Sequence, residues 1–235
     1  MKFAAIVLSA GTGKRMGSEI PKQYLPINKK PVIYYSLKAF EESGVEEIIL
    51  VAGKEDVEYC RTQIVEQYGL KKVTAIVPGG KERYDSVYEG LKAISFADYV
   101  LIHDGARPML TGEIIKRSMD AVMTEKACVV GMPVKDTIKV VDKDAFSKTT
   151  PDRNTLWQVQ TPQSFSYPLI MDAYTKLKER IAQNDRTLPA ITDDAMVAEY
   201  FLNQKIKMVE GSYENIKVTT PEDLLIAELF LNKKK

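Results

Sequence analysis

The feature that most limits the fold of this chain is a series of short apolar runs without polar alternation. The runs predicted to be strands are Phe3–Leu8, Glu47–Ala52, Val73–Val77, Tyr99–Asp104 and Cys128–Val134. Segments with apolar residues at helical spacing separate these runs, and the predicted helices are Pro31–Glu42, Glu55–Tyr68, Tyr84–Ile94 and Thr111–Thr124. Continuous apolar strands are typical of a sheet buried on both faces. The alternation predicts an α/β fold with a mainly parallel sheet flanked by helices.

The pattern changes after Val134. The segment from Lys135 to Phe165 has alternating stretches, prolines and turn residues but no helical period, which favours an extended β-arm rather than core. We therefore expect a single domain over residues 1–235, with 135–163 as a protruding arm. The elements predicted beyond the arm are helices over Tyr167–Ile181 and Thr192–Leu202, a strand over Lys205–Gly211, and a helix that begins at Thr220-Pro221.

Composition and charge exclude several classes of protein. Lys and Arg number 33 against 32 for Asp and Glu, so the net charge of +1 gives no field that would attract nucleic acid or a membrane surface. No apolar run approaches the ~20 residues of a membrane span, and the N-terminus has no signal-peptide pattern. Cys60 and Cys128 cannot build a structural zinc site or a disulfide framework. We expect a cytoplasmic protein without a nucleic-acid or membrane partner.

The loop after the first predicted strand has the composition of an anion-binding site. Ligands of open α/β sheets bind at the carboxyl ends of the strands. Gly11 and Gly13 are followed by Met16 where a dinucleotide fingerprint needs glycine, and the P-loop spacing fails as well. A glycine loop that presents backbone N–H groups, with Arg15 and Lys22 as fixed cations, suits a triphosphate. A tight turn with solvated lysines is the structural alternative.

Asp104 ends the fourth predicted strand, at the edge of the sheet where ligands bind. A single carboxylate there can hold Mg²⁺, which takes its other ligands from waters and substrate phosphates. His103 is the only histidine, and a lone histidine at such a place is more often a hydrogen-bonded structural residue than a base. No GxSxG elbow is present and no cysteine lies beside His103, so a nucleophilic triad is not expected.

Several motifs together resemble a known family. They read LSAGTGKRMGSEIPKQY, PGGKERYDSVYEGL, IHDGARP, PVKDTIK, DRNTLWQVQTPQSF, TDDA and NIKVTTPEDL. In order and spacing, from Phe3 to about Leu231, they resemble the 2-C-methyl-D-erythritol 4-phosphate cytidylyltransferases of non-mevalonate isoprenoid synthesis. Ser9 and Gly105 stand where that family often has alanine. The resemblance implies a Rossmann-like nucleotidyltransferase fold and an enzyme that joins CMP from CTP to the polyol phosphate, with release of pyrophosphate.

The resemblance also implies roles for individual residues. Arg15 and Lys22 would stabilise the charge on the α-phosphate and the leaving pyrophosphate. Lys217 would touch the phosphates of both substrates, and Asp104 would hold Mg²⁺, with Asn215 near the metal. The residues at the nucleotide would be Ala10, Gly11, Gly13, Gly80, Lys81, Ser86 and Gly105. The residues at the polyol phosphate would be Asp104, Arg107, Thr137, Arg153 and Thr161.

A homodimer with arm exchange is implied as well, because in this family the arm that carries Thr137 and Arg153 reaches into the partner subunit. Thr137 and Thr161 also fit ordinary strand positions. The closest alternative is a ribitol 5-phosphate cytidylyltransferase that makes CDP-ribitol for teichoic acid, but PVKDTIK and DRNTLWQ look more like the methylerythritol branch. A regulatory module that has lost catalysis would lack Arg15, Lys22 or Asp104, and all are present. The failed GxGxxG spacing counts against an NAD-binding oxidoreductase.

Overall fold

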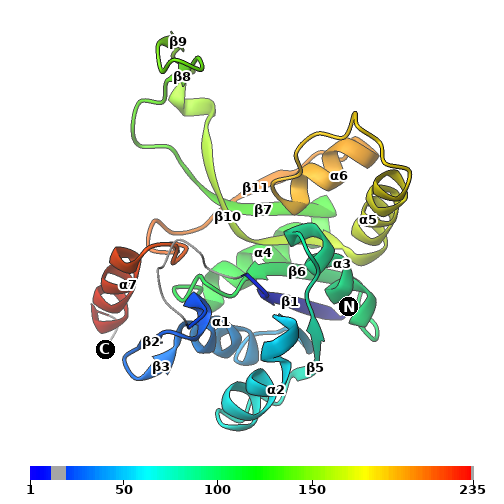
Figure 1. Cartoon of the computed structure of the whole chain (residues 1–235), viewed down its shortest axis with the longest axis vertical. Coiled ribbons are helices and arrows are strands. Elements are labelled where there is room, and N and C mark those ends of the chain that lie inside the picture. The colour runs from blue at the N-terminus through cyan, green and yellow to red at the C-terminus, as the bar shows by residue number, and fades with distance from the viewer. Residues whose placement is uncertain (12–19, 234–235) are drawn as a thin grey trace.

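The predicted apolar runs lie in one central sheet, which also contains β10 and β11 and has the strand order β11-β7-β10-β6-β1-β4-β5 (Figure 1). The computed structural model of the chain describes residues 1–11 and 20–233. The strands of this sheet are β1 (Phe3–Ser9), β4 (Glu47–Ala52), β5 (Val73–Pro78), β6 (Tyr99–Asp104), β7 (Ala127–Pro133), β10 (Trp157–Ser166) and β11 (Lys207–Glu210). β1 pairs in parallel with β4 and β6, whereas β10 runs antiparallel to β6 and β7. The prediction of a mainly parallel sheet is confirmed.

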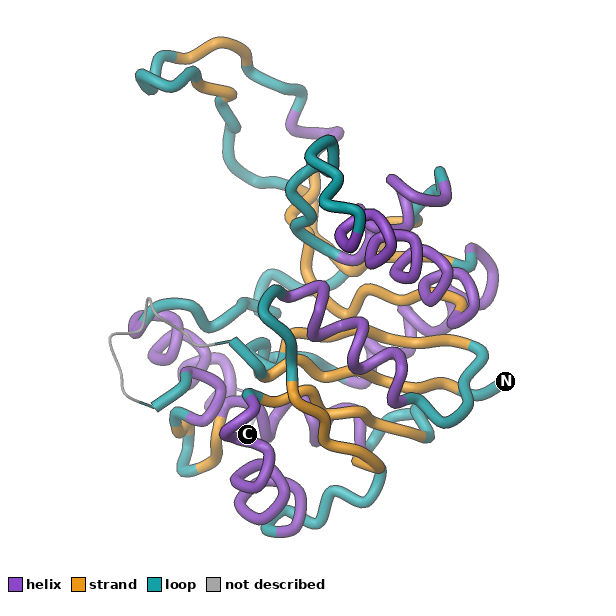
Figure 2. Tube along the Cα trace, turned by 45° about the vertical axis from the view of Figure 1, so that its right-hand side comes forward, coloured by secondary structure: helices purple, strands orange, loops and turns teal. Residues whose placement is uncertain are grey.

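Helices cover both faces of this sheet (Figure 2). One face packs against α1 (Val32–Glu41), α2 (Val57–Tyr59) with the helical turns beside it, and α4 (Gly112–Glu125). The other face packs against α3 (Arg83–Ala93), α5 (Tyr167–Ala182) and α6 (Asp194–Leu202). Ala5 and Val7 of β1 lie in the first cluster, and Ala4 and Ile6 lie in the second. Because both faces are covered, this strand needs no polar alternation.

The predicted helices are present, and two differences from prediction concern the first residue of one helix and the type of another. α4 begins as expected, since the Thr111 hydroxyl accepts the N–H of Ile114 at 3.3 Å. Pro31 is the N-cap residue of α1 and not its first helical residue. The helix predicted over Glu55–Tyr68 is irregular, with a 3₁₀ turn and α2 followed by a π-helix over Cys60–Glu66. Periodicity alone did not indicate this change of helix type.

The arm leaves the body of the molecule and carries a small ladder at its end, formed by β8 (Val140–Val141) and β9 (Ser147–Thr149) (Figure 1). At its base, the Val134 N–H donates to the Leu156 carbonyl at 3.0 Å. The chain then enters β10, which lies between β6 and β7 in the central sheet. Residues 157–163 were assigned to the arm from their sequence, and the structure corrects this: they belong to the sheet.

Buried polar residues explain why β10 does not look like a core strand. Gln160, Thr161 and Gln163 are buried, and each is hydrogen-bonded to groups far away in the sequence. Gln163 Oε1, for example, accepts the backbone N–H groups of Asp194 and Ala195 at 2.9 Å. Polar side chains with such partners are stable in a core, but their sequence pattern resembles an exposed segment.

The C-terminal helix α7 (Pro221–Lys233) fixes the segment that precedes it. It packs beside the short ladder of β2 (Pro26–Ile27) and β3 (Lys30–Pro31), in a cluster that contains Val218 and Ala227. The Val218 N–H donates to the Ala106 carbonyl at 2.8 Å, just beyond the end of β6. This bond brings the neighbouring Lys217 to the carboxyl edge of the sheet. Within the described residues, no helix is long and apolar enough to cross a membrane.

Candidate active site

A cavity of about 310 Å³ lies at the carboxyl edge of the sheet, between the ends of β1 and β6 and the start of α3. This is where ligands of open α/β sheets bind. The predicted site residues that line it are Ala10, Gly11, Lys22, Gly80, Lys81, Ser86, Asp104 and Lys217. The structure therefore brings together residues that are spread over most of the sequence.

Asp104 lies at the centre of a cluster of positive charge. Its Oδ2 is 2.8 Å from Lys217 Nζ and 3.9 Å from Arg107 Nε, and its Oδ1 is 3.5 Å from Arg83 Nε. The Asp104 side chain is only 12% exposed. A buried carboxylate needs such partners, because an unpaired charge at this depth would be costly.

The charge state of Asp104 follows from two opposed effects. Burial acts to raise its pKa, but the positive charges of Arg83, Lys217 and Arg107 outweigh burial and lower the pKa of Asp104 well below its ordinary value. The carboxylate is therefore ionised at neutral pH. Arg83 also pairs with Asp194, so these three cations face two carboxylates and a net positive charge remains, which suits an incoming phosphate.

Glycine brings the loop before α3 close to the end of β1. A Cβ added at Gly79 would lie 2.4 Å from the Cβ of Ala10, so only glycine allows this approach. The Gly80 N–H donates to Ser86 Oγ at 3.1 Å, and the Ser86 hydroxyl donates to the Glu82 carbonyl at 3.2 Å. Gly80 and Ser86 thus hold the loop in shape as well as lining the cavity.

The structure describes the glycine loop after β1 only at its two ends, up to residue 11 and from residue 20. Lys22 begins a 3₁₀ turn over Lys22–Tyr24 and lines the cavity. The next residue, Gln23, is buried and donates to the carbonyls of Ser9 at 2.7 Å and Gly11 at 3.2 Å. This side chain ties the far end of the loop back to β1. Gly13 and Arg15, to which nucleotide and catalytic roles were assigned, lie outside the described residues.

Other predicted residues lie behind the cavity. The Gly105 N–H donates to the Leu8 carbonyl at 2.9 Å, which leaves that donor engaged within the fold. Arg107 is largely buried, and its Nη1 donates to the Asn215 carbonyl at 2.8 Å. Asn215 is fully buried and donates to the Gln160 side chain and the Thr161 carbonyl. These residues support the floor of the site beneath Asp104.

Thr161 and His103 are also part of this floor. Thr161 Oγ1 accepts the Asp104 N–H at 3.1 Å and lies 2.9 Å from His103 Nδ1. Burial lowers the pKa of His103 to about 3, so the imidazole is neutral at physiological pH. The interpretation of His103 as a structural residue agrees with this placement.

Thr137 and Arg153 lie on the arm, and both are exposed. Arg153 Nη1 donates to the Lys135 carbonyl at 3.2 Å, within the arm itself. Neither residue is among those described around the cavity of its own chain.

Sequence reasoning missed a buried ion pair that supports the site. Arg83 lines the cavity, and its two terminal nitrogens each lie 2.7 Å from an oxygen of Asp194. Burial opposes the charge of Arg83, but the carboxylates of Asp194 and Asp104 raise its pKa well above the ordinary value. Both residues stand inside quoted motifs, PGGKERYDS and TDDA, but 111 positions separate them. The only signal in the sequence was that the two residues carry opposite charges.

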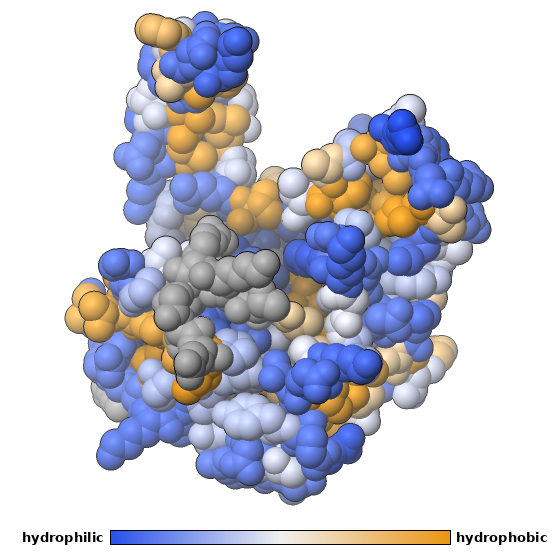
Figure 3. All heavy atoms as spheres, viewed as in Figure 1, coloured by the Kyte–Doolittle hydropathy of each residue, from blue (hydrophilic) through white to orange (hydrophobic). Residues whose placement is uncertain are grey.

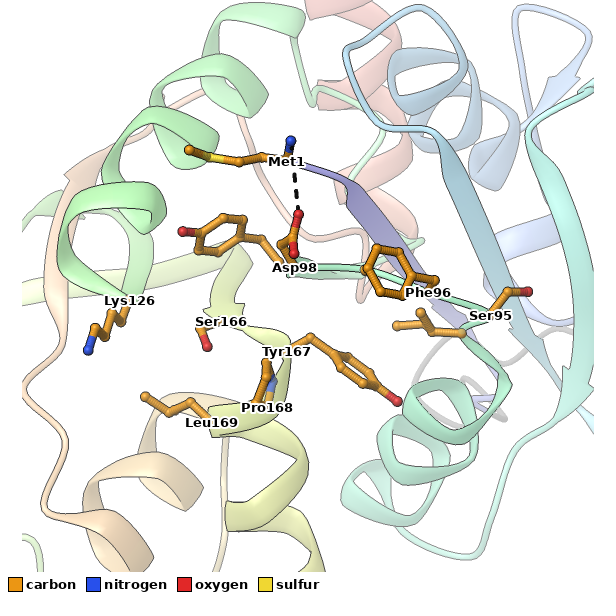
Figure 4. Close-up of a pocket in the computed structure, with 12 residues that line it drawn as sticks. Met1, Ser95, Phe96, Asp98, Lys126, Ser166, Tyr167, Pro168 and Leu169 are labelled. Atoms are coloured by element: carbon orange, nitrogen blue, oxygen red, sulfur yellow. Dashed lines mark ion pairs between the residues drawn. The ribbon is translucent and has the colours of Figure 1, made fainter.

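A larger cavity, of about 740 Å³, lies at the opposite edge of the sheet (Figure 4). Phe96, Tyr167 and Leu169 are among the residues that line it. Its carboxylate, Asp98, is 45% exposed and is paired with the N-terminal amine at 4.0 Å. The described residues of this cavity include no cluster of cations around a buried carboxylate, so size alone does not identify the functional site.

The donor set suits a cation that brings its own ligands. Among the described residues, no group of three or more His, Cys, Asp or Glu side chains is placed to hold a metal ion. Asp104 offers one ionised carboxylate at the cavity, and Mg²⁺ can take its remaining ligands from waters and substrate phosphates. Asn215 Oδ1 is a second oxygen, buried and without a hydrogen-bond partner in the described part of the chain.

The fold and the site together define an α/β protein with a cavity rich in positive charge at the carboxyl edge of its sheet. A sequence model of the 2-C-methyl-D-erythritol 4-phosphate cytidylyltransferases matches residues 3–233. The chain belongs to this family. The resemblance seen in the motifs is confirmed, and membership decides against an NAD-binding oxidoreductase.

Relatives and solved structures agree over nearly the whole length. A relative from Lachnospira eligens with the family's name is 56% identical over 228 residues, covering 97% of this chain and 98% of the relative. Another, from Lachnoclostridium phytofermentans, is 47% identical over 232 residues, covering 99% and 97%. The crystal structure of 4-diphosphocytidyl-2C-methyl-D-erythritol synthase from Anaerococcus prevotii is 32% identical, with a TM-score of 0.83 and 98% of both chains covered.

Proposed function

We propose that this chain joins CMP from CTP to 2-C-methyl-D-erythritol 4-phosphate and releases pyrophosphate. The observation that carries the proposal is the cavity at the ends of β1 and β6, where Lys22, Asp104 and Lys217 meet in a member of this family. Relatives that align with 97% or more of this chain carry the corresponding name. That name also favours methylerythritol phosphate over ribitol phosphate.

The reaction is a nucleotidyl transfer at phosphorus. An oxygen of the polyol phosphate attacks the α-phosphorus of CTP, the bond from that phosphorus to the bridging oxygen breaks, and pyrophosphate leaves with the electron pair. A phosphate monoester has a second pKa near ~6, so it is largely a dianion at neutral pH and needs no general base. A buried, neutral His103 is therefore no obstacle to this chemistry.

The protein must neutralise and align anions that repel each other. Lys22 and Arg15 would stabilise the charge on the α-phosphate and the leaving pyrophosphate. The Lys217 ammonium, now 2.8 Å from Asp104, would turn to the substrate phosphates when they enter the cavity. Arg107, behind Asp104, would add positive charge to the floor.

A divalent cation is part of the same proposal. Asp104 would hold Mg²⁺ at the end of β6, and Asn215 could add an oxygen from beneath. When bound, the ion would offset the negative charge of the triphosphate. The chain's own contribution is an ionised carboxylate in a fixed position, held from below by the Thr161 hydroxyl on the Asp104 backbone.

A homodimer in which the arms are exchanged completes the proposal. Apolar side chains gather along the arm (Figure 3), and the large exposed ones are Ile138, Val140, Val141 and Phe146. An exposed apolar arm of this kind favours burial against another surface. Because Thr137 and Arg153 are exposed on the arm, a partner's cavity would be their place of action. We also propose that the enzyme works in the cytoplasm.

The decisive experiment incubates the purified chain with CTP, MgCl₂ and either 2-C-methyl-D-erythritol 4-phosphate or ribitol 5-phosphate. We expect pyrophosphate release to be fast with the first acceptor, and phosphorus NMR to show the diphosphate bridge of the product. The reaction without acceptor controls for hydrolysis of CTP. Equal rates with both acceptors would contradict the substrate assignment, and no release with either would contradict transferase activity and leave the regulatory module as the interpretation.

A further inference from the structure

Arg83 joins two buried carboxylates that come from distant parts of the chain. Its Nη1 and Nη2 form a fork on Asp194, at 2.7 Å each, and its Nε faces Asp104 Oδ1 at 3.5 Å. The Asp194 side chain has no exposed surface. One guanidinium thus connects the start of α3, the start of α6 and the end of β6.

Asp194 is itself held firmly. The Tyr174 hydroxyl donates to Asp194 Oδ1 at 2.5 Å, and the Asp194 N–H donates to Gln163 Oε1 at 2.9 Å. A two-bond fork between guanidinium and carboxylate fixes the plane of the arginine as well as its position. Arg83 therefore presents its Nε edge to Asp104 in one orientation.

Lys217 and Arg107, the other cations at Asp104, are placed differently. The Lys217 side chain is 37% exposed, lines the cavity and carries a flexible point charge. On the proposed function, Lys217 turns to the substrate phosphates, and Asp104 then loses its nearest partner. Arg107 is more distant, at 3.9 Å, and its Nη1 is engaged by the Asn215 carbonyl. Among the described residues, Arg83 and Arg107 both stay in place, and Arg83 is the nearer of the two to Asp104, at 3.5 Å.

We propose that Arg83, anchored by Asp194, is the positioning residue that keeps the Asp104 carboxylate facing the cavity while Lys217 binds the substrate phosphates. This inference rests on the proposed function. Asp194 does not line the cavity, and of the two side chains that bond its carboxylate, Arg83 and Tyr174, only Arg83 lines it. Its effect on turnover must therefore depend on Asp104.

A double-mutant cycle tests this dependence. We expect Asp194→Asn to lower kcat about 10-fold or more in the otherwise unchanged chain, because a single bond replaces the fork on Arg83. In an Asp104→Asn background the same change should cost less than about 3-fold, since the carboxylate that Arg83 positions is gone. A loss of the same factor in both backgrounds would show that Asp194 only supports the fold, and would overturn the proposal.

CTP binding measured by calorimetry without metal gives a second readout. Asp194→Asn leaves every cation of the cavity in place, so CTP affinity should not weaken by more than about 3-fold while kcat falls. A collapsed site would weaken both. The control is Lys178→Ala, which removes the Lys178–Asp85 ion pair, at 2.6 Å, between α5 and α3 and should leave kcat unchanged.

The double variant Arg83→Met with Asp194→Asn removes both charges, so no unpaired charge remains buried and the chain is expected to fold. Low turnover with an unchanged unfolding midpoint supports the proposal, and full turnover overturns it. If this variant does not fold, the cycle between Asp194→Asn and Asp104→Asn decides. An inactive wild-type chain refutes the proposed function together with this inference, whereas an active wild type with an equally active Asp194→Asn variant refutes this inference alone.

Discussion

Lys217→Ala should lower activity strongly while changing stability little. The Lys217 ammonium lies 2.8 Å from Asp104 Oδ2, but the side chain is 37% exposed, so solvent screens much of the attraction. Partly exposed ion pairs contribute about 0–1 kcal/mol. Asp104 also keeps Arg83 and Arg107 after the change. We expect the free energy of unfolding to fall by no more than about 1 kcal/mol.

The effect on activity should be much larger. If the ammonium binds the phosphates of both substrates, its loss removes a charge-assisted contact that strengthens in the transition state. Removing one such donor typically costs on the order of 100-fold in rate, which corresponds to about 2.7 kcal/mol. We expect a fall of that order in kcat/KM, measured by pyrophosphate release at saturating Mg²⁺.

A matched control lies on another part of the surface. Lys178 is 34% exposed and pairs with Asp85 at 2.6 Å, so its ion pair resembles that of Lys217 in exposure and length. Lys178→Ala should change stability by a similar amount and leave kcat/KM intact. The reasoning fails if Lys217→Ala retains kcat/KM within about 3-fold of wild type, or if both variants lose activity equally.

Four further outcomes are expected. CTP should be used far better than ATP, GTP or UTP, because a site that pairs with one base edge leaves polar groups unsatisfied with another; a comparable kcat/KM for a purine triphosphate would reject the assignment. Lys22→Ala and Arg15→Ala should each lower kcat on the order of 100-fold, and near-normal turnover of the folded variants would make the loop a structural turn. Excess EDTA should abolish activity and Asp104→Asn should weaken the use of Mg²⁺, whereas full activity in EDTA rejects the metal. Arg15→Ala and Arg153→Ala chains refolded together should recover about a quarter of the sites if each site takes one residue from each subunit; no recovery in confirmed mixed dimers would mean that Arg153 acts at the site of its own chain or at no substrate.

Much of the fold follows from the sequence because its core strands carry their own signal. Glu47–Ala52 and Tyr99–Asp104 have the predicted bounds, since unbroken apolar runs between turn residues have few other stable places. β10 was misassigned because Gln160 and Gln163 interrupt its apolar pattern. Their burial depends on partners such as Ser212 and Asp194, which a local pattern does not contain.

The candidate site also contains residues that the sequence predicted and contacts that it did not. Gly11, Lys22 and Asp104 were found from their positions after predicted strands, where ligands of such folds bind, whereas Ala10 and Lys81 came from the family resemblance. The position of Thr161 beneath Asp104 could not be found in this way, because its hydrogen bonds to His103 and to the Asp104 N–H join different strands. The fork between Arg83 and Asp194 was missed for the same reason: it forms only when α3 and α6 pack on one face of the sheet.

The base of the arm has a consequence for how the chain can be altered. Val134 and Leu156 are joined by a backbone hydrogen bond at 3.0 Å, and Pro133 and Trp157 are already paired across β7 and β10. The arm is therefore an insertion at the tip of a hairpin that is closed without it. A short turn in its place would leave every ladder of the central sheet intact. The arm can therefore be shortened, lengthened or exchanged independently of the body that carries Asp104.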